Sequence, residues 1–525
     1  MGTYLNPGNA AFADIRNDIY IDKSGLIELI NQSINTPRRL SCVSRPRRFG
    51  KSFAAQMLCA YYDRSCDSSA LFEDLAIAKK TSFRKHLNQY DVIYIDMSGT
   101  APYTDNYQML IPFLSNNITC EIMEIFPDLK RGTSLPETLV NAASLSGRKF
   151  IMIIDEWDAP IREHPQLQKE YLTFLRSLFK NSGITAKAFA AAYMTGILPI
   201  KKDGSQSAIS DFEEFTILDP KEFAAYVGFT ETEVQKLCVD FHRDFHRMKQ
   251  WYDGYTLGET HSVYNPNSVM KAIRSNRFNS YWTETSAADS LLHYISRDAK
   301  GLGQTIAQLI GGSDVPVDIY GFANDLVTFR NQDDVLTLLA HLGYLSYDEN
   351  TKKVHIPNEE IRLEFARTIR LDQRQDTLQR VQESDRLILD TVHRNADAVA
   401  RQIEKVHMEA TNPLNANNEN SLRAVIQLAY FSYKDYYLKM EELPTGHGYA
   451  DIVYLPKPGE YVPALLVELK WNQSAETAIS QIKRNKYPEA LRDYRGDILL
   501  VGISYSKESE AGCRQYSCII EPLTR

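Results

Sequence analysis

The chain has 525 residues, of which 43% are hydrophobic and 24% are charged, and this composition excludes an extended disordered protein. Its length is several times that of a common domain, so we expect two or three domains. The 59 basic and 67 acidic residues give a net charge of −8. That balance argues against a protein that coats nucleic acid through bulk charge, but it leaves a local basic site open.

The cysteines and the N-terminal residues indicate the compartment. The seven cysteines form no CxxC pair and no ladder with histidines, so we expect reduced thiols and no structural zinc. Residues 1–23 lack the apolar region of a signal peptide, and no window has the roughly 20 apolar residues of a membrane span. We therefore expect a cytoplasmic protein that does not bind membranes.

Residues 40–220 alternate between strand and helix patterns. Short runs of apolar and β-branched residues predict strands at Leu40–Val43, Val92–Met97, Phe150–Asp155, Ala190–Gly196 and Phe215–Leu218. Amphipathic segments such as Ser52–Asp63 and Gln168–Asn181 separate them. This alternation predicts a parallel sheet that is covered by helices on both faces.

The middle of the chain has a different pattern. Strand signals fade between about 221 and 320, where helical patterns dominate. A helix pattern at Asp334–Leu342, a turn at Gly343 and a two-stranded ribbon through Lys353–Ile356 indicate a winged-helix-like module, although any helix followed by a hairpin has this order. Residues 370–410 have the pattern of a charged helical connector, and Asn412–Asn420 has the composition of a linker.

The residues after this linker predict a second α/β domain. A helix at Glu419–Phe431 is followed by strands near Tyr437–Glu442, Ala450–Leu455 and Ala464–Lys470, a helix at Ala475–Lys486 and a buried strand at Ile498–Ser504. The order α-β-β-β-α-β differs from that of the first domain.

The loop between the first strand and the first long helix resembles half of a phosphate-binding loop. It reads SRPRRFGKS from Ser44 to Ser52. Gly50 allows a tight turn, Lys51 can reach the β- and γ-phosphates, and the Ser52 hydroxyl can ligate Mg²⁺. Arg45 stands where the pattern requires its first glycine, so this half-motif alone is a weak signal.

Two further strand ends strengthen the prediction of a nucleotide site. The apolar run Phe150–Ile154 ends in Asp155 and Glu156, and in P-loop NTPases these positions supply an Asp for Mg²⁺ and a Glu for the attacking water. Buried strands often end in acidic residues, but the joint occurrence with the strand, loop and helix favours a function. If the strand that ends at Thr195 lies between the other two, Thr195 would face the γ-phosphate as a polar sensor.

Seven segments carry a family resemblance: IYIDKSGLI (19–27), SRPRRFGKS (44–52), IMIIDEWDAP (151–160), YMTGILPI (193–200), WYDGY (251–255), VYNPNSV (263–269) and YWTETS (281–286). They resemble the bacterial AAA-ATPase-like family, whose members usually continue into a PD-(D/E)XK nuclease-superfamily domain. In that family an arginine-rich loop replaces the first glycine, so Arg45 is typical of it. Asp158 also recurs, without a role that the sequence discloses.

The resemblance implies an α/β protein with an additional-strand, AAA-like P-loop sheet, a helical and winged-helix-like middle, and a restriction-endonuclease-like C-terminal domain. The corresponding divisions are an ATPase domain at 1–220, a helical extension at 221–325, a winged-helix-like segment and connector at 326–410, and a nuclease-like domain at 411–525. Six basic residues and no acidic one lie between 37 and 51. They are either a solvated charge run or contacts for phosphates, with Arg48 as the candidate for the nucleotide.

A second site is expected on the C-terminal sheet. Glu468 and Lys470 lie two residues apart on one strand and so share a face. If this strand pairs antiparallel with its predecessor, Asp451 comes close to Glu468, and the two carboxylates can flank a divalent cation beside the Lys470 ammonium. An isolated ExK pattern is more often a surface ion pair, but the element order and the D–ExK spacing match the PD-(D/E)XK core.

The same resemblance implies two further elements of this site. Gln481, on the following helix, is at the position of the family's glutamine. The acidic residue on the first helix would be Glu419, although a favourable interaction with the helix dipole explains Glu419 equally well.

The sequence therefore predicts an ATP-binding and hydrolysing protein coupled to a metal-dependent nuclease. ATP and Mg²⁺ are the expected cofactors, with Mn²⁺ as an alternative at the nuclease-like site, and nucleic acid is the expected partner, with DNA favoured. A patch such as Lys483 and Arg484 would supply the contact. Two alternatives remain: a nucleotide-gated protein whose nuclease-like domain binds without cleaving, and a regulatory ATPase of the STAND type. Assembly into a homo-oligomer is left open.

Overall fold

The computed structural model describes residues 2–100, 109–180, 182–200, 202–203, 206–207, 209, 211–282, 302–323, 329–371, 375–410, 419–430, 432–433, 436–445, 448–457, 460, 462–484, 494, 496–506 and 515–523. The chain divides into two compact units. The first contains Met1–Thr285 and Pro316–Leu363, and the second contains Ser286–Val315 and Glu364–Arg525.

A five-stranded parallel sheet forms the centre of the first unit. Its order is β2-β3-β4-β1-β7, and the strands are β1 (Leu40–Ser44), β2 (Asp91–Asp96), β3 (Phe150–Asp155), β4 (Phe189–Gly196) and β7 (Glu213–Phe215). The predicted parallel sheet is confirmed, and the last strand lies slightly earlier in the chain than expected. Because β4 lies between β1 and β3, the carboxyl ends of these three strands are adjacent.

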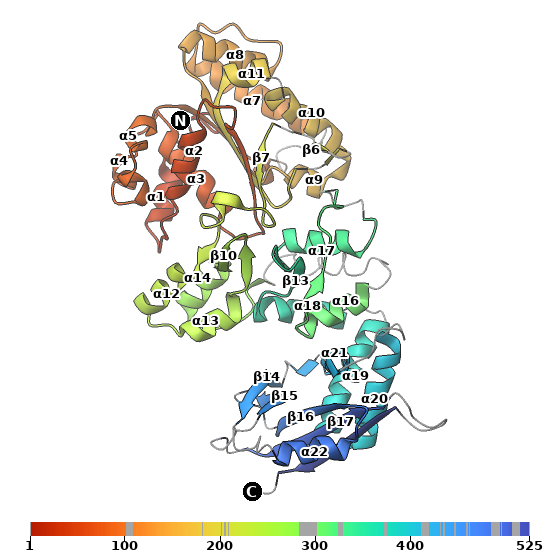
Figure 1. Cartoon of the computed structure of the whole chain (residues 1–525). Helices are drawn as coiled ribbons and strands as arrows, with labels where there is room; N and C mark the ends of the chain where they lie inside the picture. The colour runs from red at the N-terminus through yellow and green to blue at the C-terminus, as the bar shows by residue number, and fades with distance from the viewer. Residues whose placement is uncertain are drawn as a thin grey trace. The chain divides into compact units, whose positions relative to one another are not determined.

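Both faces of this sheet are buried, as its continuous apolar strands require. Along β3, Phe150, Met152 and Ile154 belong to one core with α7 (Leu110–Ile125), α8 (Leu135–Ser146) and α10 (Gln168–Phe179). Ile151 and Ile153 belong to a second core with α2 (Gly25–Ser33) and α3 (Lys51–Tyr62) (Figure 1). The two-residue period of a strand thus divides one apolar run between two helical layers.

Shorter elements complete the ATPase-like part: α1 (Ala10–Arg16), α4 (Ser69–Phe72), η1 (Ala76–Lys79), α5 (Phe83–His86), α6 (Met97–Thr100), α9 (Ala159–Glu163), η4 (Pro165–Leu167), α11 (Ser182–Ala188), β5 (Lys202–Asp203), β6 (Gln206–Ser207) and η5 (Lys221–Phe223).

Helices dominate the region from 221 to 320, as expected, but the region also contains short strands that the sequence analysis did not predict. It contains α12 (Glu231–Asp240), α13 (Phe245–Tyr252), α14 (Pro266–Ser275) and α16 (Leu302–Ile310). It also contains a sheet of order β8-β10-β9, formed by β8 (Phe229–Thr230), β9 (Tyr255–Leu257) and β10 (Thr260–Tyr264). These strands have two to five residues, too few to show an alternating pattern.

The expected helix, glycine turn and ribbon are confirmed. They are α17 (Gln332–His341) and the antiparallel strands β12 (Ser346–Asp348) and β13 (Lys353–His355), to which β11 (Val315–Pro316) adds a third strand. α18 (Glu359–Leu371) follows. The winged-helix assignment of this segment stays a prediction.

A mixed five-stranded sheet forms the centre of the second unit, in the order β14-β15-β16-β17-β18. The strands are β14 (Tyr437–Thr445), β15 (Gly448–Pro456), β16 (Ala464–Trp471), β17 (Ile498–Tyr505) and β18 (Tyr516–Pro522), and the helices beside them are α21 (Glu419–Ala429) and α22 (Ala475–Arg484). Only β16 and β17 run parallel. The predicted order α-β-β-β-α-β is confirmed, and β18 is an additional strand.

The helices expected to form a connector belong to this second core. Ile388 of α19 (Gln375–Val392) and Ile403 of α20 (Ala396–Ala410) pack in one cluster with Val425 and Val467. α22 covers the opposite face. The expected linker lies largely in residues 411–418, outside the described residues, and the finer four-part division of the chain stays a prediction. Within the described part of the chain, no helix is long and apolar enough to span a membrane.

Candidate nucleotide site and candidate nuclease site

The phosphate-loop segment connects β1 to α3 through two residues with left-handed backbone conformations. Gly50 has φ +92° and is the N-cap of α3, which begins at Lys51. Arg48 has φ +68°, and a non-glycine residue in this region is under strain. The Arg48 guanidinium donates to the Tyr281 carbonyl at 2.8 Å. At position 50, glycine adopts the positive φ without the steric cost that a side chain would add.

Arg45 has a structural role, and its buried guanidinium is not available to bind phosphates. Its side chain is fully buried, and it donates to the carbonyls of Ser44 and Phe215 at 2.9 Å each and of Phe223 at 3.3 Å. Burial lowers the pKa of Arg45 to about 10. The residue that replaces the first loop glycine thus ties β1 to β7 and to the segment that follows it.

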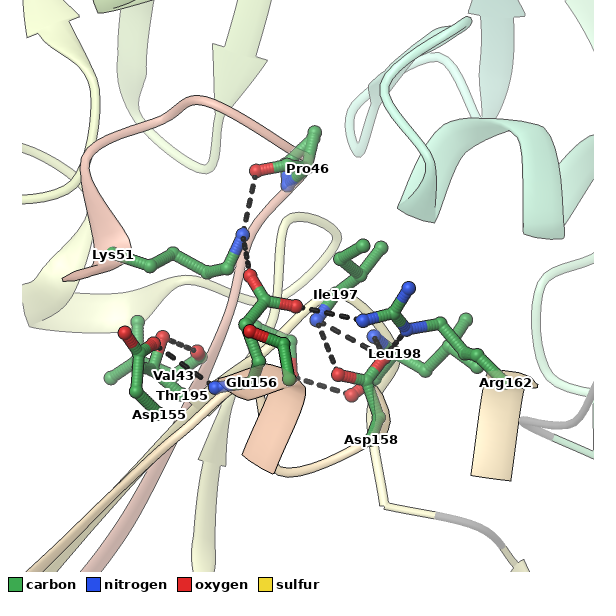
Figure 2. A network of polar contacts seen from close by, with 12 residues as sticks. Val43, Pro46, Lys51, Asp155, Glu156, Asp158, Arg162, Thr195, Ile197 and Leu198 are labelled. Atoms are coloured by element: carbon green, nitrogen blue, oxygen red, sulfur yellow. Dashed lines mark hydrogen bonds and ion pairs between the residues drawn. The ribbon is translucent and has the colours of Figure 1, made fainter. Parts of the chain in front are cut away.

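Lys51 and Ser52 lie at the carboxyl end of β3, opposite the acidic pair. The Lys51 ammonium is buried, donates to the Pro46 carbonyl at 3.1 Å and lies 3.3 Å from Glu156 Oε1 (Figure 2). The Ser52 side chain forms a hydrogen bond with Asp155, whose pKa is raised to about 6, mainly by burial. The four residues expected from the two motifs are therefore brought together.

The Glu156 carboxylate lies between two cations of the chain. Its Oε2 accepts a hydrogen bond from Arg162 at 2.8 Å, while its Oε1 faces Lys51 (Figure 2). The Glu156 backbone is left-handed, with φ +49°, and its N–H donates to Asp155 Oδ1 at 3.0 Å. This backbone turn directs the two consecutive acidic side chains differently: Asp155 toward Ser52 and Glu156 toward the loop lysine.

Asp158 has a role that the sequence did not disclose. Its buried carboxylate accepts hydrogen bonds from the N–H groups of Ile197 and Leu198, just after β4, and from Arg162 Nε at 3.0 Å. It thereby fastens the end of β4 to the turn after β3. The spacing of Asp158 and Arg162, i and i+4 on α9, is the sequence signal that could have revealed this pair.

Thr195 lies on β4 between β1 and β3, as the sensor hypothesis requires. Its buried hydroxyl donates to the Val43 carbonyl at 2.9 Å (Figure 2). The position is thus the expected one, and a contact with phosphate stays a prediction.

A cavity of about 560 Å³ opens beside these residues. Arg48, Lys51, Ser52 and Glu156 line its polar part. Its apolar part comes from distant segments of the same unit, namely Ile19, Tyr20, Ile21, Phe229, Pro266 and Met270. A largely apolar pocket with a charged end has the size and chemistry of a small-molecule site. Ile19, Tyr20, Ile21 and Pro266 belong to two of the segments that carry the family resemblance, but the sequence analysis did not connect those segments with a pocket.

The second candidate site lies where β15 and β16 stop pairing. The ladder ends at the pair Ile452–Val467, so Asp451 and Glu468 come immediately after the last paired residues. Asp451 Oδ2 accepts the Leu469 N–H at 2.8 Å. This contact brings the Asp451 carboxylate beside β16, as the hairpin hypothesis expected.

Glu468 is the centre of this second site. Its carboxyl is almost fully buried, and Oε1 accepts hydrogen bonds from Lys470 at 3.0 Å and from Gln481. Burial and the charge of Asp451 raise the pKa of Glu468 to about 7. All four residues expected here are thus brought together, whereas the side chain of Glu419 lies outside the described residues.

Arg423 is a member of this site that the sequence analysis missed. It lies on α21 and donates to Asp451 Oδ1 at 2.9 Å. No sequence motif marks it. The packing of α21 against the sheet brings it beside Asp451, where the pairing of β15 with β16 stops.

Both sites offer oxygen ligands that suit Mg²⁺. Glu468 Oε2 is buried and has no hydrogen-bond partner among the described residues, so one carboxylate oxygen is available beside Asp451. In the first site the available groups are the Ser52 hydroxyl and the Asp155 carboxylate. No group of three or more His, Cys, Asp and Glu side chains in the described part of the chain could hold a metal ion. The fit is to Mg²⁺ ligated by one or two protein groups together with water and substrate phosphates.

The sheet order and the phosphate loop give the first unit the fold of an AAA-like P-loop domain, and the second unit contains a mixed α/β domain with a D–ExK site. Residues 8–205 match the AAA-ATPase-like family, described as predicted AAA-ATPases, and residues 417–514 match the PD-(D/E)XK nuclease superfamily. The chain therefore carries an AAA-ATPase-like domain and a PD-(D/E)XK nuclease-superfamily domain.

Two solved structures show a weak likeness. They are Cdc6p from Pyrobaculum aerophilum (13% identity, 67% of this chain and 94% of that chain, TM-score 0.26) and the ORC2 protein of Aeropyrum pernix in ADPNP–ADP complexes (10%, 66%, 93%, 0.26). We draw no conclusion about function from structural similarity at this level. No curated protein matches the chain.

Proposed function

We propose that the protein binds and hydrolyses ATP and that this activity is coupled to metal-dependent cleavage of nucleic-acid phosphodiesters. One observation carries the ATPase proposal: Lys51 and Ser52 of the phosphate loop lie against Asp155 and Glu156 beside a cavity of about 560 Å³. Lys51 would bind the β- and γ-phosphates, Ser52 and Asp155 would hold Mg²⁺, and Glu156 would orient the attacking water. Arg48, the Gly50 amide and Thr195 would complete the contacts to the nucleotide.

In the second unit, Asp451 and Glu468 would hold Mg²⁺ or Mn²⁺. The cation would supply Lewis-acid stabilisation of the charge that develops on the phosphate. Lys470 would orient the water or neutralise that charge, and Gln481 would hold Glu468 in place. DNA is the favoured substrate. Arg484 would contact its backbone beside Gln481, together with Lys483, which in this structure pairs with Glu521 at 2.5 Å. The six described cysteines are free, which supports a reducing, cytoplasmic location.

A second candidate is a nucleotide-gated regulatory protein whose nuclease-like domain binds nucleic acid without cleaving it. The pairing of Asp451 with Arg423 favours it, because this arginine neutralises one of the two carboxylates that cleavage needs. The close contact of Glu156 with both Lys51 and Arg162 similarly favours slow hydrolysis.

The two candidates are separated by one set of variants. Lys51→Ala should abolish ATP turnover, because no other cation of the loop can replace the buried ammonium. Lys470→Ala should abolish cleavage of plasmid or single-stranded DNA in Mg²⁺ or Mn²⁺ and leave ATP turnover intact. Two exposed lysines provide controls, Lys85→Ala for the first unit and Lys405→Ala for the second.

Each assignment has its own contrary result. Normal ATP turnover by Lys51→Ala would show that the loop is wrongly assigned. If the wild type cleaves no substrate with either metal, with or without ATP, the non-cleaving alternative is correct.

A further inference from the structure

The strand β17 contributes a glycine next to the centre of the nuclease-like site. Glu468 and Gly502 are partners in the parallel pairing of β16 with β17, and partners in a ladder direct their side chains to the same face of the sheet. For Glu468 this is the face that α22 covers, because Gln481 of α22 donates to Glu468 Oε1. A side chain at position 502 would therefore point toward α22.

The space for such a side chain is already taken by the helix. A methyl group at position 502 would lie 2.7 Å from the Ala475 carbonyl oxygen, 3.0 Å from Ile479 Cγ1 and 3.1 Å from Ala478 Cβ. Non-bonded carbon atoms make favourable contact at about 3.5–4.0 Å. The nearest of the three atoms belongs to the backbone of α22, so the rotation of a side chain cannot relieve this contact. Even an alanine would thus force α22 away from β17.

The distance between α22 and the sheet decides whether Gln481 reaches Glu468. Lys470 and Gln481 both donate to Oε1 of this buried carboxyl, while Oε2 has no hydrogen-bond partner among the described residues. A side-chain hydrogen bond does not extend beyond about 3.5 Å, so an outward shift of the helix weakens the bond from Gln481. With one donor fewer, the carboxylate can turn away from its present orientation.

We propose that Gly502 is a positioning residue of the nuclease-like site. It lets α22 approach the sheet closely enough for Gln481 to hold Glu468, so that the carboxylate keeps one orientation when a divalent cation binds to it. Gly502 itself touches neither the cation nor the nucleic acid. The loss of a group that orients a metal ligand typically lowers metal affinity about ten- to a hundredfold. This inference rests on the proposed metal site.

The test is a Mn²⁺ titration of the full chain without nucleotide, in which free Mn²⁺ is followed by electron paramagnetic resonance. Glu468→Ala identifies the Mn²⁺ that belongs to this site. The titration compares the wild type with Gly502→Ala, with Gln481→Ala and with the double variant. Ile498→Val is the control, because Ile498 lies on the same strand and in the same apolar core with α22, and its substitution loosens that core without adding a side chain at position 502.

We expect Gly502→Ala and Gln481→Ala each to weaken Mn²⁺ binding roughly tenfold or more. Because Gly502 acts through Gln481, the double variant should bind Mn²⁺ no more weakly than Gln481→Ala alone. Ile498→Val should keep the wild-type affinity, although thermal unfolding should show that it is less stable. This combination separates positioning from a general loss of stability.

A further variant tests the distance without disturbing the contact at Gly502. Gln481→Asn retains the amide but shortens the side chain by one methylene group, so we expect it to weaken Mn²⁺ binding as Gln481→Ala does. Thermal unfolding checks that each variant is folded. If Gly502→Ala unfolds, Gln481→Asn decides, and a wild-type affinity in this variant would contradict the proposal.

Two contrary results are distinguishable. If Glu468→Ala removes a Mn²⁺ site but a folded Gly502→Ala binds Mn²⁺ as tightly as the wild type, or if the double variant binds much more weakly than Gln481→Ala, Gly502 does not act through Gln481 and the metal site stands. If the wild type shows no Mn²⁺ site that depends on Glu468, the proposed metal-dependent nuclease itself is wrong.

Discussion

The nucleotide site and the nuclease-like site contain the same kinds of group in different settings. Each has one buried carboxyl with a raised pKa, Asp155 at about 6 and Glu468 at about 7, and in both cases burial is the main cause. Each also has a carboxylate paired with an arginine, Glu156 with Arg162 and Asp451 with Arg423. In both sites, basic side chains of the protein itself neutralise negative charge that a ligand would otherwise neutralise.

The ion pairs of the two arginines differ in their exposure to solvent. Arg162 is 10% exposed and also pairs with Asp158, which is 1% exposed and fastens the end of β4. The ion pair of Arg423 is more open, with exposed fractions of 22% for the arginine and 15% for Asp451. Burial of an ion pair makes the loss of one partner costly. The comparison therefore indicates that Arg162 belongs to the framework of its site, whereas the ion pair of Arg423 with Asp451 is more accessible to solvent.

The largest expected effect is on activity, when Glu156 of the nucleotide site or Glu468 of the nuclease-like site is replaced by glutamine. Glu156→Gln should lower ATP turnover about 10²- to 10⁴-fold, the usual loss when a general base is removed, and leave the binding of a fluorescent ATP analogue unchanged. Glu468→Gln should instead abolish both Mn²⁺ binding and cleavage in the second unit. Turnover and binding assays on the two variants measure this difference.

If Glu156→Gln also loses nucleotide binding, Glu156 is part of the binding surface, and the expected difference between Glu156 and Glu468 is wrong. Glu137→Gln is a suitable control, since this exposed carboxylate bonds Thr133 in a loop.

The next effect is on stability and distinguishes the two arginines. Arg162→Gln leaves Asp158 buried beside a neutral side chain, so we expect a loss of about 3 kcal/mol in the free energy of unfolding. Arg423→Gln should cost less than about 1 kcal/mol, because its pair is partly solvated. Urea denaturation of both variants gives the comparison.

Arg16→Gln is the control for the arginine pairs. It removes a partner of Asp74, whose side chain is 65% exposed, and its cost should be as small as that of Arg423→Gln. Equal losses for Arg162→Gln and Arg423→Gln would show that the two pairs do not differ in kind.

Local patterns predicted most of the fold, because they depend on neighbouring residues. The apolar run from Phe150 to Ile154 predicts a strand buried on both faces, and β3 is such a strand. The strands of β8-β10-β9 were missed because they are too short for periodicity. The helices at 375–410 were mistaken for a connector because their polar faces dominate the composition, and only the tertiary core shows where their apolar stripe packs.

The residues with chemical motifs were predicted, and those that act through packing were not. Lys51, Asp155 and Glu468 each follow from a pattern that the chemistry requires. Arg423 is an ordinary helix residue in the sequence, and its place beside Asp451 depends on how α21 meets the sheet. The role of Arg45 also depends on packing: the sequence places it in the arginine-rich loop, and in the structure its guanidinium donates to three backbone carbonyls.

The smallest expected effect is the pH dependence that the two raised pKa values impose on the metal-free protein. The ordinary pKa of Glu468 is 4.5, and in the folded state it is about 7. Between these values the folded state binds more protons than the unfolded state, so stability falls as the pH rises through this window and is lowest above about pH 7. Glu468→Gln cannot ionise, and it should therefore be more stable than the wild type at about pH 8 and gain nothing at about pH 4.

Asp155 provides the matched case, because its pKa rises from 3.8 to about 6. Asp155→Asn should therefore show its full gain in stability by about pH 6, one pH unit earlier than Glu468→Gln. Calorimetric unfolding of the wild type and both variants, in a chelating buffer and across this pH range, measures the two windows. If neither substitution changes the pH dependence, burial does not keep these carboxyls protonated, and the electrostatic similarity of the two sites is wrong.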